Sequence, residues 1–201
     1  MSYSIQNINE LPSEIELKKK SQALALLDAI IEPDWEYRYF SFNCDWNQHE
    51  KEMMASMRDG SGNEYFLLFS ENGVAGKVFY GQNGTSLLLT SVPDCFSSFK
   101  NEAAFSIDNA SFYFWRSHKD EKWSVSPNDL KTYDLLGFLA NDSSYYHQWA
   151  ESYYEKSINA EMLEIIFNTL YVDSDMLKKL NPKLTIEELR EDILEIIGND
   201  A

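Results

Sequence analysis

Two short runs of this sequence are apolar at every position, and they restrict the fold more than any other feature. Residues 65–69 read Tyr-Phe-Leu-Leu-Phe, and residues 112–115 read Phe-Tyr-Phe-Trp. Their aromatic content favours strands. An antiparallel sheet with one wet face would alternate apolar and polar residues, because neighbouring side chains of a strand point to opposite faces. We therefore expect a sheet that is covered on both faces.

The segment from Trp35 to Tyr80 predicts an antiparallel meander. Extended, aromatic-rich stretches alternate with turns rich in Gly and Asn, which accept the positive φ that hairpin turns need. The prediction is a sheet of about five strands, at residues 37–42, 52–58, 64–69, 76–80 and 112–115.

Helices are predicted at both ends of the chain. Ser13 and Glu16 form a capping box, and the helix they begin ends near Ile31, before Pro33. A short helix is expected at residues 93–100, and further helices at 128–139, 143–156, 160–171, 174–180 and 186–197, with Asn159, Asp173 and Thr185 as N-caps. This order predicts an α+β fold: a sheet domain over residues 1–125 with an N-terminal helix, and a helical C-terminal region over residues 126–201, packed as one globular unit.

The charge balance limits the partners of the chain. It has 33 acidic and 17 basic residues, a net charge of -16, yet it is 14% aromatic. Disordered acidic chains are poor in aromatic residues, so this composition indicates a folded domain. Nucleic acids and anionic membranes are disfavoured, whereas a basic protein partner is favoured. Residues 141–201 carry 13 acidic and five basic residues, which is half of the net charge.

The two cysteines and the N-terminal segment indicate a soluble cytoplasmic protein. Cys44 and Cys95 match no metal or redox motif and are expected to be free thiols in a reducing compartment. Residues 18–31 fail as a signal peptide, because acidic residues precede the lysines and the apolar run is short. No metal or other cofactor is expected, since the three histidines have no ligand spacing.

The segment from Asn43 to Glu50 is the strongest candidate for chemistry. Asp45, His49 and Glu50 could serve a hydrolase of small molecules or peptides if their side chains converge in a pocket. The structural alternative is a loop in which Asp45 and Gln48 cap one helical turn, with His49 and Glu50 on its exposed side.

The last predicted helix is the first candidate for a docking surface. An apolar stripe lies opposite an acidic stripe made of Glu187, Glu188, Glu191, Asp192 and Glu195. The alternative is a solvated face on a packing helix. Trp46 is a further candidate for contacting a partner, as an exposed aromatic residue. Arg58 is another candidate, and it could pair with Asp59 or Glu64.

The same central segment carries a resemblance. Residues 39–43, Trp46, residues 54–58, Gly60-Ser61-Gly62 and residues 65–69 resemble a family of uncharacterised bacterial proteins, and the similarity continues through Pro93, Phe96, Phe99 and Trp115-Arg116. It covers about residues 35–125 and implies no catalytic roles. At the level of class, small acidic bacterial proteins of this build resemble immunity proteins that neutralise toxins.

Three hypotheses follow. The first is a non-enzymatic acidic protein-binding module, in one form an immunity protein that masks a cationic toxin. The second is the hydrolase described above. The third is a structural or regulatory interaction module, and a homo-oligomer is compatible with the sequence.

Overall fold

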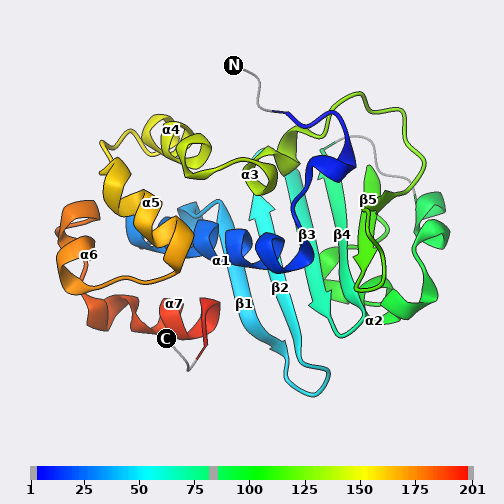
Figure 1. The fold of residues 1–201 in the computed structure, drawn as a ribbon, viewed down its shortest axis with the longest axis horizontal. Helices are drawn as coiled ribbons and strands as arrows, with labels where there is room; N and C mark the ends of the chain where they lie inside the picture. Colours follow the sequence, from blue (N-terminus) through cyan, green and yellow to red (C-terminus); the bar gives the residue numbers. More distant parts are fainter. Residues whose placement is uncertain (1–3, 82–85, 199–201) are drawn as a thin grey trace.

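The computed structural model describes residues 4–81 and 86–198, and its centre is one antiparallel sheet (Figure 1). Its six strands neighbour one another in chain order. They are β1 (Phe40–Asn47), β2 (Glu52–Arg58), β3 (Asn63–Ser70), β4 (Gly73–Tyr80), β5 (Phe112–Ser117) and β6 (Ser124–Val125). The predicted α+β class is confirmed. The strand beyond the expected five is β6, a two-residue segment paired with β5.

Helices precede and follow the strands as predicted. They are α1 (Glu14–Ile31), α2 (Ser97–Lys100), α3 (Gly137–Ala140), α4 (Ser143–Tyr153), α5 (Ala160–Thr169), α6 (Ser174–Leu180) and α7 (Ile186–Ile196). The capping box at Ser13 is present, and the side chains of Asn159, Asp173 and Thr185 cap α5, α6 and α7. Within the described ranges, no helix is both long and apolar enough to cross a membrane.

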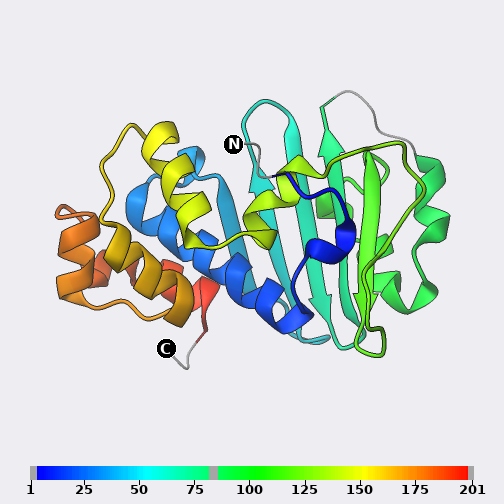
Figure 2. The same cartoon turned by 45° about the horizontal axis from the view of Figure 1, so that its top comes forward.

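The sheet is covered on both faces, as the two apolar runs predict. Alternate residues of β3 enter different cores: Tyr65, Leu67 and Phe69 pack on one face, and Phe66 and Leu68 on the other. Helix α1 and the C-terminal helices cover the first face, and the segment containing α2 covers the second (Figures 1 and 2). The helical region therefore shares one continuous core with the sheet.

Helix α1 is the centre of the first core. Twelve of its residues are buried, including the whole stretch from Ser21 to Ile31. It contacts strand β1 and the helices α3, α5, α6 and α7. Figure 2 shows it running across the sheet with the C-terminal helices beside it. This position explains why its second half is apolar on all sides.

The edge strand β1 is protected by the last helix. The Asn43 side chain donates to Glu195 at 3.2 Å, and the Cys44 thiol donates to the Leu194 carbonyl at 3.4 Å. Arg38, just before β1, pairs with both carboxylate oxygens of Asp192. Helix α7 is thus fixed to the sheet by polar contacts as well as by its apolar stripe.

Several predicted boundaries are wrong: β4 begins three residues earlier than expected and α4 ends three residues earlier, and two segments differ more. The first strand begins at Phe40 instead of Tyr37 and continues to Asn47, with an irregular register after Asn43. The expected helix at residues 128–139 begins only with a 3-10 turn at Asp134. Before it, the chain is held by backbone pairing of Tyr133 with Ile5, a contact 128 positions away in sequence that local helix propensity cannot reveal.

Candidate functional site

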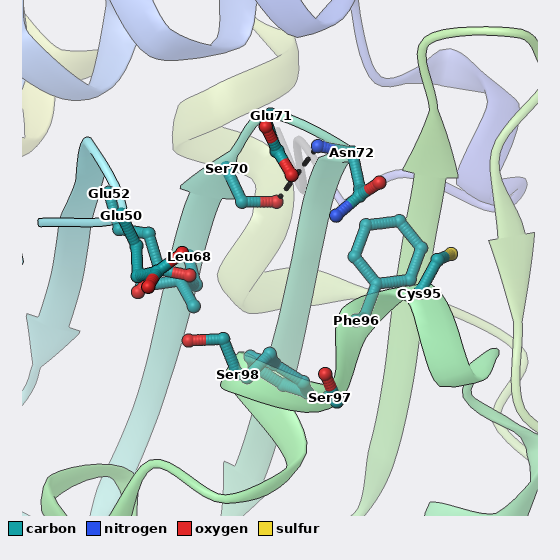
Figure 3. Close-up of a pocket in the computed structure, with 11 residues that line it drawn as sticks. Glu50, Glu52, Leu68, Ser70, Glu71, Asn72, Cys95, Phe96, Ser97 and Ser98 are labelled. Atoms are coloured by element: carbon teal, nitrogen blue, oxygen red, sulfur yellow. Dashed lines mark hydrogen bonds between the residues drawn. The ribbon is translucent and has the colours of Figure 1, made fainter.

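An acidic pocket opens on the second face of the sheet, between the ends of β2 and β3 and the segment leading into α2. Its volume is about 160 Å³. Its eleven lining residues include three glutamates, Glu50, Glu52 and Glu71, and no basic residue. Figure 3 shows Glu50 and Glu52 on one side of the pocket and the Phe96 ring on the other. The pocket is therefore a small recess of negative charge with an aromatic wall.

Strand geometry explains why the lysine between the two glutamates is absent from the pocket. Glu52 and Met54 are two positions apart on β2, so they share the face of the second core. Lys51 has a left-handed backbone, with φ of 54°, and its side chain lines a different groove beside Ile15 of α1. Lys51 thus lines the groove on the opposite face, which Glu71 also lines, and no basic residue lines the pocket itself.

Glu52 is the most unusual residue of the pocket. It is only 4% exposed, and its Oε2 accepts a hydrogen bond from the Asn47 side chain at 3.3 Å. Its Oε1 has no hydrogen-bond or ion-pair partner among the described residues. A buried carboxylate is normally paired with a cation or fully hydrogen-bonded. The pocket thus contains one almost fully buried carboxylate with a free acceptor.

The remaining walls combine apolar and weakly polar groups. Leu68, Phe96 and Phe99 are almost fully buried and form the apolar wall, while Ser70 and Asn72 lie at the turn after β3. The Ser70 hydroxyl accepts the Asn72 amide at 3.3 Å (Figure 3) and donates to the Gly73 carbonyl at 3.3 Å. These hydrogen bonds within the turn stabilise its conformation.

The predicted catalytic group does not converge. Asp45 lies on β1 and accepts a hydrogen bond from Gln48, and His49 is exposed in the turn, with no polar partner among residues of known placement. Only Glu50 lines the pocket. The expected capped helical turn is instead the end of a strand followed by a β-turn. Within the described chain, no three His, Cys, Asp or Glu residues are placed to hold a metal ion.

The acidic stripe of α7 is partly engaged within the chain. Asp192 pairs with Arg38, Glu195 accepts from Asn43, and Glu188 caps its own helix through Thr185. Burial and the nearby Asp192 raise the pKa of Glu195. Two of the five stripe carboxylates, those of Glu187 and Glu191, are exposed and make no polar contact that the described residues reveal.

Trp46 is less exposed than expected, whereas Arg58 is exposed but lacks the expected pairing with Asp59 or Glu64. Trp46 is half-buried, stacks on Phe105 with ring centroids 5.9 Å apart, and donates to Glu102 at 3.0 Å. Arg58 lies 5.1 Å from the centroid of the Phe66 ring and forms no ion pair with a described residue. Both side chains are anchored by aromatic packing on the second face.

A buried carboxylate that sequence patterns do not reveal lies in the first core. Asp28 is fully buried within α1. Its Oδ2 accepts the amides of Tyr39 and Phe40 at 2.7 and 2.9 Å, and its Oδ1 accepts the Tyr146 hydroxyl at 2.6 Å. Burial raises its pKa to about 6, although these hydrogen bonds oppose the rise. Asp28 thus joins α1, the start of β1 and α4, which is a structural role.

A second groove, of about 310 Å³, lies on the first face beside α1. Ile15, which is 82% exposed, forms part of its rim. The His118 ring at its edge is hydrogen-bonded to Glu14, and Arg116 lies 3.5 Å from the same carboxylate. Arg116 and His118 both pair with Glu14 here, whereas Lys18 and Lys51, which also line the groove, form no ion pair with a described residue.

Comparisons of the chain with protein families, with curated proteins and with solved structures find no match.

The pocket could not be located from the sequence. Its residues come from three separate segments, 50–52, 68–72 and 95–99, which meet only when the segment after β4 folds back over the sheet. One signal is visible afterwards: Glu52 is an acidic residue at the start of an otherwise apolar strand. A lone buried acid of this kind is a candidate for function.

Proposed function

We propose that this protein is a non-enzymatic acidic module that binds a basic protein, with the acidic pocket at the centre of its docking surface. The observation that carries the proposal is the set of three glutamates around a recess without a basic residue. The chain as a whole carries a net charge of -16. The field of such a surface accelerates encounter with a cationic partner, and the pocket supplies a fixed point of contact.

Geometry favours binding over hydrolysis. His49 is exposed, and neither it nor Asp45 lines the pocket with Glu50. Sites for small-molecule substrates usually measure about 300–1,000 Å³. The pocket is about 160 Å³, which suits the end of one side chain rather than a substrate. An immunity protein that masks a cationic toxin would use this mode of recognition.

The proposal is tested by capturing partners on the immobilised protein at about 50 and 300 mM salt and measuring association rates for each purified partner. We expect a basic protein whose association rate falls steeply with salt, because screening weakens the steering between charged surfaces. A charge-reversed variant, Glu50→Lys, should slow association, whereas the matched reversal Glu164→Lys, at an exposed position of α5 on the other face of the sheet, should slow it much less. A best partner that is acidic, or that associates independently of salt, would refute the proposal.

A further inference from the structure

We infer that the acidic pocket receives the alkylammonium group of a lysine side chain. This inference rests on the proposed function, because it names the chemical group that the basic partner inserts. It starts from Glu52, whose carboxylate is buried beside Asn47 and keeps Oε1 without a partner among the described residues. This oxygen is open to the pocket, where a cation could contact it directly.

The walls of the pocket fit both parts of a lysine side chain. Leu68 and Phe99 offer apolar surface to the methylene stem, in the way that lysine stems lie along apolar groups while the charged end reaches polar partners. Phe96 presents an aromatic ring across from the carboxylates (Figure 3), and an ammonium near such a ring is attracted by its negative face. Carboxylates and an aromatic wall together select an alkylated cation.

Size and charge exclude the main alternatives. A dry cavity of about 150 Å³ holds a molecule the size of benzene, so a pocket of similar volume admits one side-chain end. The pocket volume is about 160 Å³. A metal ion needs several converging ligands, which the described residues do not provide. A guanidinium is broad, planar and suited to a bidentate carboxylate, whereas Oε2 of Glu52 is already engaged by Asn47. A compact ammonium needs only one free oxygen.

The experiment uses Nα-acetyl-lysine N-methylamide as the probe and follows backbone amide signals of the ¹⁵N-labelled full chain by NMR. The matched control is the norleucine analogue, which keeps the aliphatic stem and lacks the charge. We expect saturable shifts at residues 50–52, 68–72 and 95–99 with the lysine probe only. Equal shifts with norleucine, or shifts spread over the whole surface, would overturn the inference.

Variants locate the charge that matters. Glu52→Gln keeps an acceptor for Asn47 and removes the negative charge, so we expect the dissociation constant to rise more than about tenfold. Glu50→Gln, at the exposed rim, should raise it less than about fivefold. Glu187→Gln on α7 is the control and should leave it unchanged. Thermal melting checks that Glu52→Gln is folded; if it is not, the inference stands or falls on the Glu50→Gln and norleucine results.

The outcomes separate this inference from the proposed function. If a basic partner is captured and Glu52→Gln leaves its affinity unchanged, the lysine inference is wrong and the protein-binding proposal survives. If the lysine probe binds the pocket as described and no basic partner shows salt-dependent association, the inference holds and the proposed function fails.

Discussion

Asp28 should make the stability of this protein depend on pH in the opposite sense to most carboxylates. Its pKa rises from 3.8 to about 6 in the folded chain, because burial disfavours the ionised form. The folded state therefore binds a proton more tightly than the unfolded state does. The free energy of unfolding must then fall as pH rises through this range, since folding is favoured where the folded state holds more protons.

The size of the effect follows from the shift. One pKa unit corresponds to about 1.4 kcal/mol, so a difference of about 2.2 makes the ionised Asp28 cost about 3 kcal/mol well above pH 6. By the same linkage, about 1.4 kcal/mol of this cost is removed between pH 8 and pH 5. Other carboxylates also titrate, so the comparison must isolate this one.

The Asp28→Asn variant isolates the contribution of this carboxylate to the pH dependence of stability. The side-chain oxygen of Asn can accept hydrogen bonds from the backbone amides of Tyr39 and Phe40, and its NH2 group can donate to the Tyr146 oxygen. We expect the stability of the native protein, measured by urea unfolding relative to Asp28→Asn, to improve by about 1.4 kcal/mol from pH 8 to pH 5. Tyr146→Phe removes a donor to the carboxylate and should move this dependence to higher pH.

A relative stability that is equal at pH 8 and pH 5, or that improves as pH rises, would refute the reasoning. The first result would mean that Asp28 titrates below this range, as it would if its hydrogen bonds with Tyr39, Phe40 and Tyr146 outweighed its burial. The second would mean that the pH dependence comes from a group other than Asp28.

Three further outcomes are expected. Gly73→Ala should lower the free energy of unfolding in urea by about 3 kcal/mol or more, because at φ of 129° a Cβ would lie 2.2 Å from a carbonyl oxygen of β5. Gly60→Ala, at φ of 69° with no atom within 4 Å, should cost only about 1–2 kcal/mol, and equal losses would contradict this account. Lys77→Met should lower the free energy of unfolding by about 2–4 kcal/mol, because the buried ammonium donates to one carboxylate and two carbonyls. A decrease of less than about 1 kcal/mol would show that these bonds are weak. Cys95 is exposed, whereas burial raises the pKa of Cys44, so Cys95→Ser should abolish the fast phase of thiol labelling by Ellman's reagent, and a fast phase that persists would contradict the assignment.

The fold was largely predictable because its signals are local. Glu52–Arg58 and Ser174–Leu180 have the bounds expected from periodicity and turn residues, and the two apolar runs correctly predict a sheet covered on both faces. The first strand was misplaced because its second half, Asn43 to Asn47, is polar. That half is held by an irregular register with β2 and by contacts with α7, which are tertiary features.

The candidate site was much less predictable. The acidic stripe of α7 is conspicuous in sequence, yet Asp192 and Glu195 serve packing against residues near β1. The acid at the start of β2 is visible in sequence, but the burial of Glu52 depends on a segment about 45 residues later that covers the sheet. Charge periodicity identifies exposed faces, whereas a recess formed by distant segments needs the fold itself.

The contact between α7 and β1 has a consequence for self-association. A bare edge strand presents unpaired backbone groups to which another chain can add a strand, and this is a common route to aggregation. The opposite edge, β6, is only two residues long and offers little to such pairing. The eight-residue edge of β1 is the vulnerable one. A chain that stopped before Ile186 would leave this edge open, so the last helix protects the folded protein against self-association.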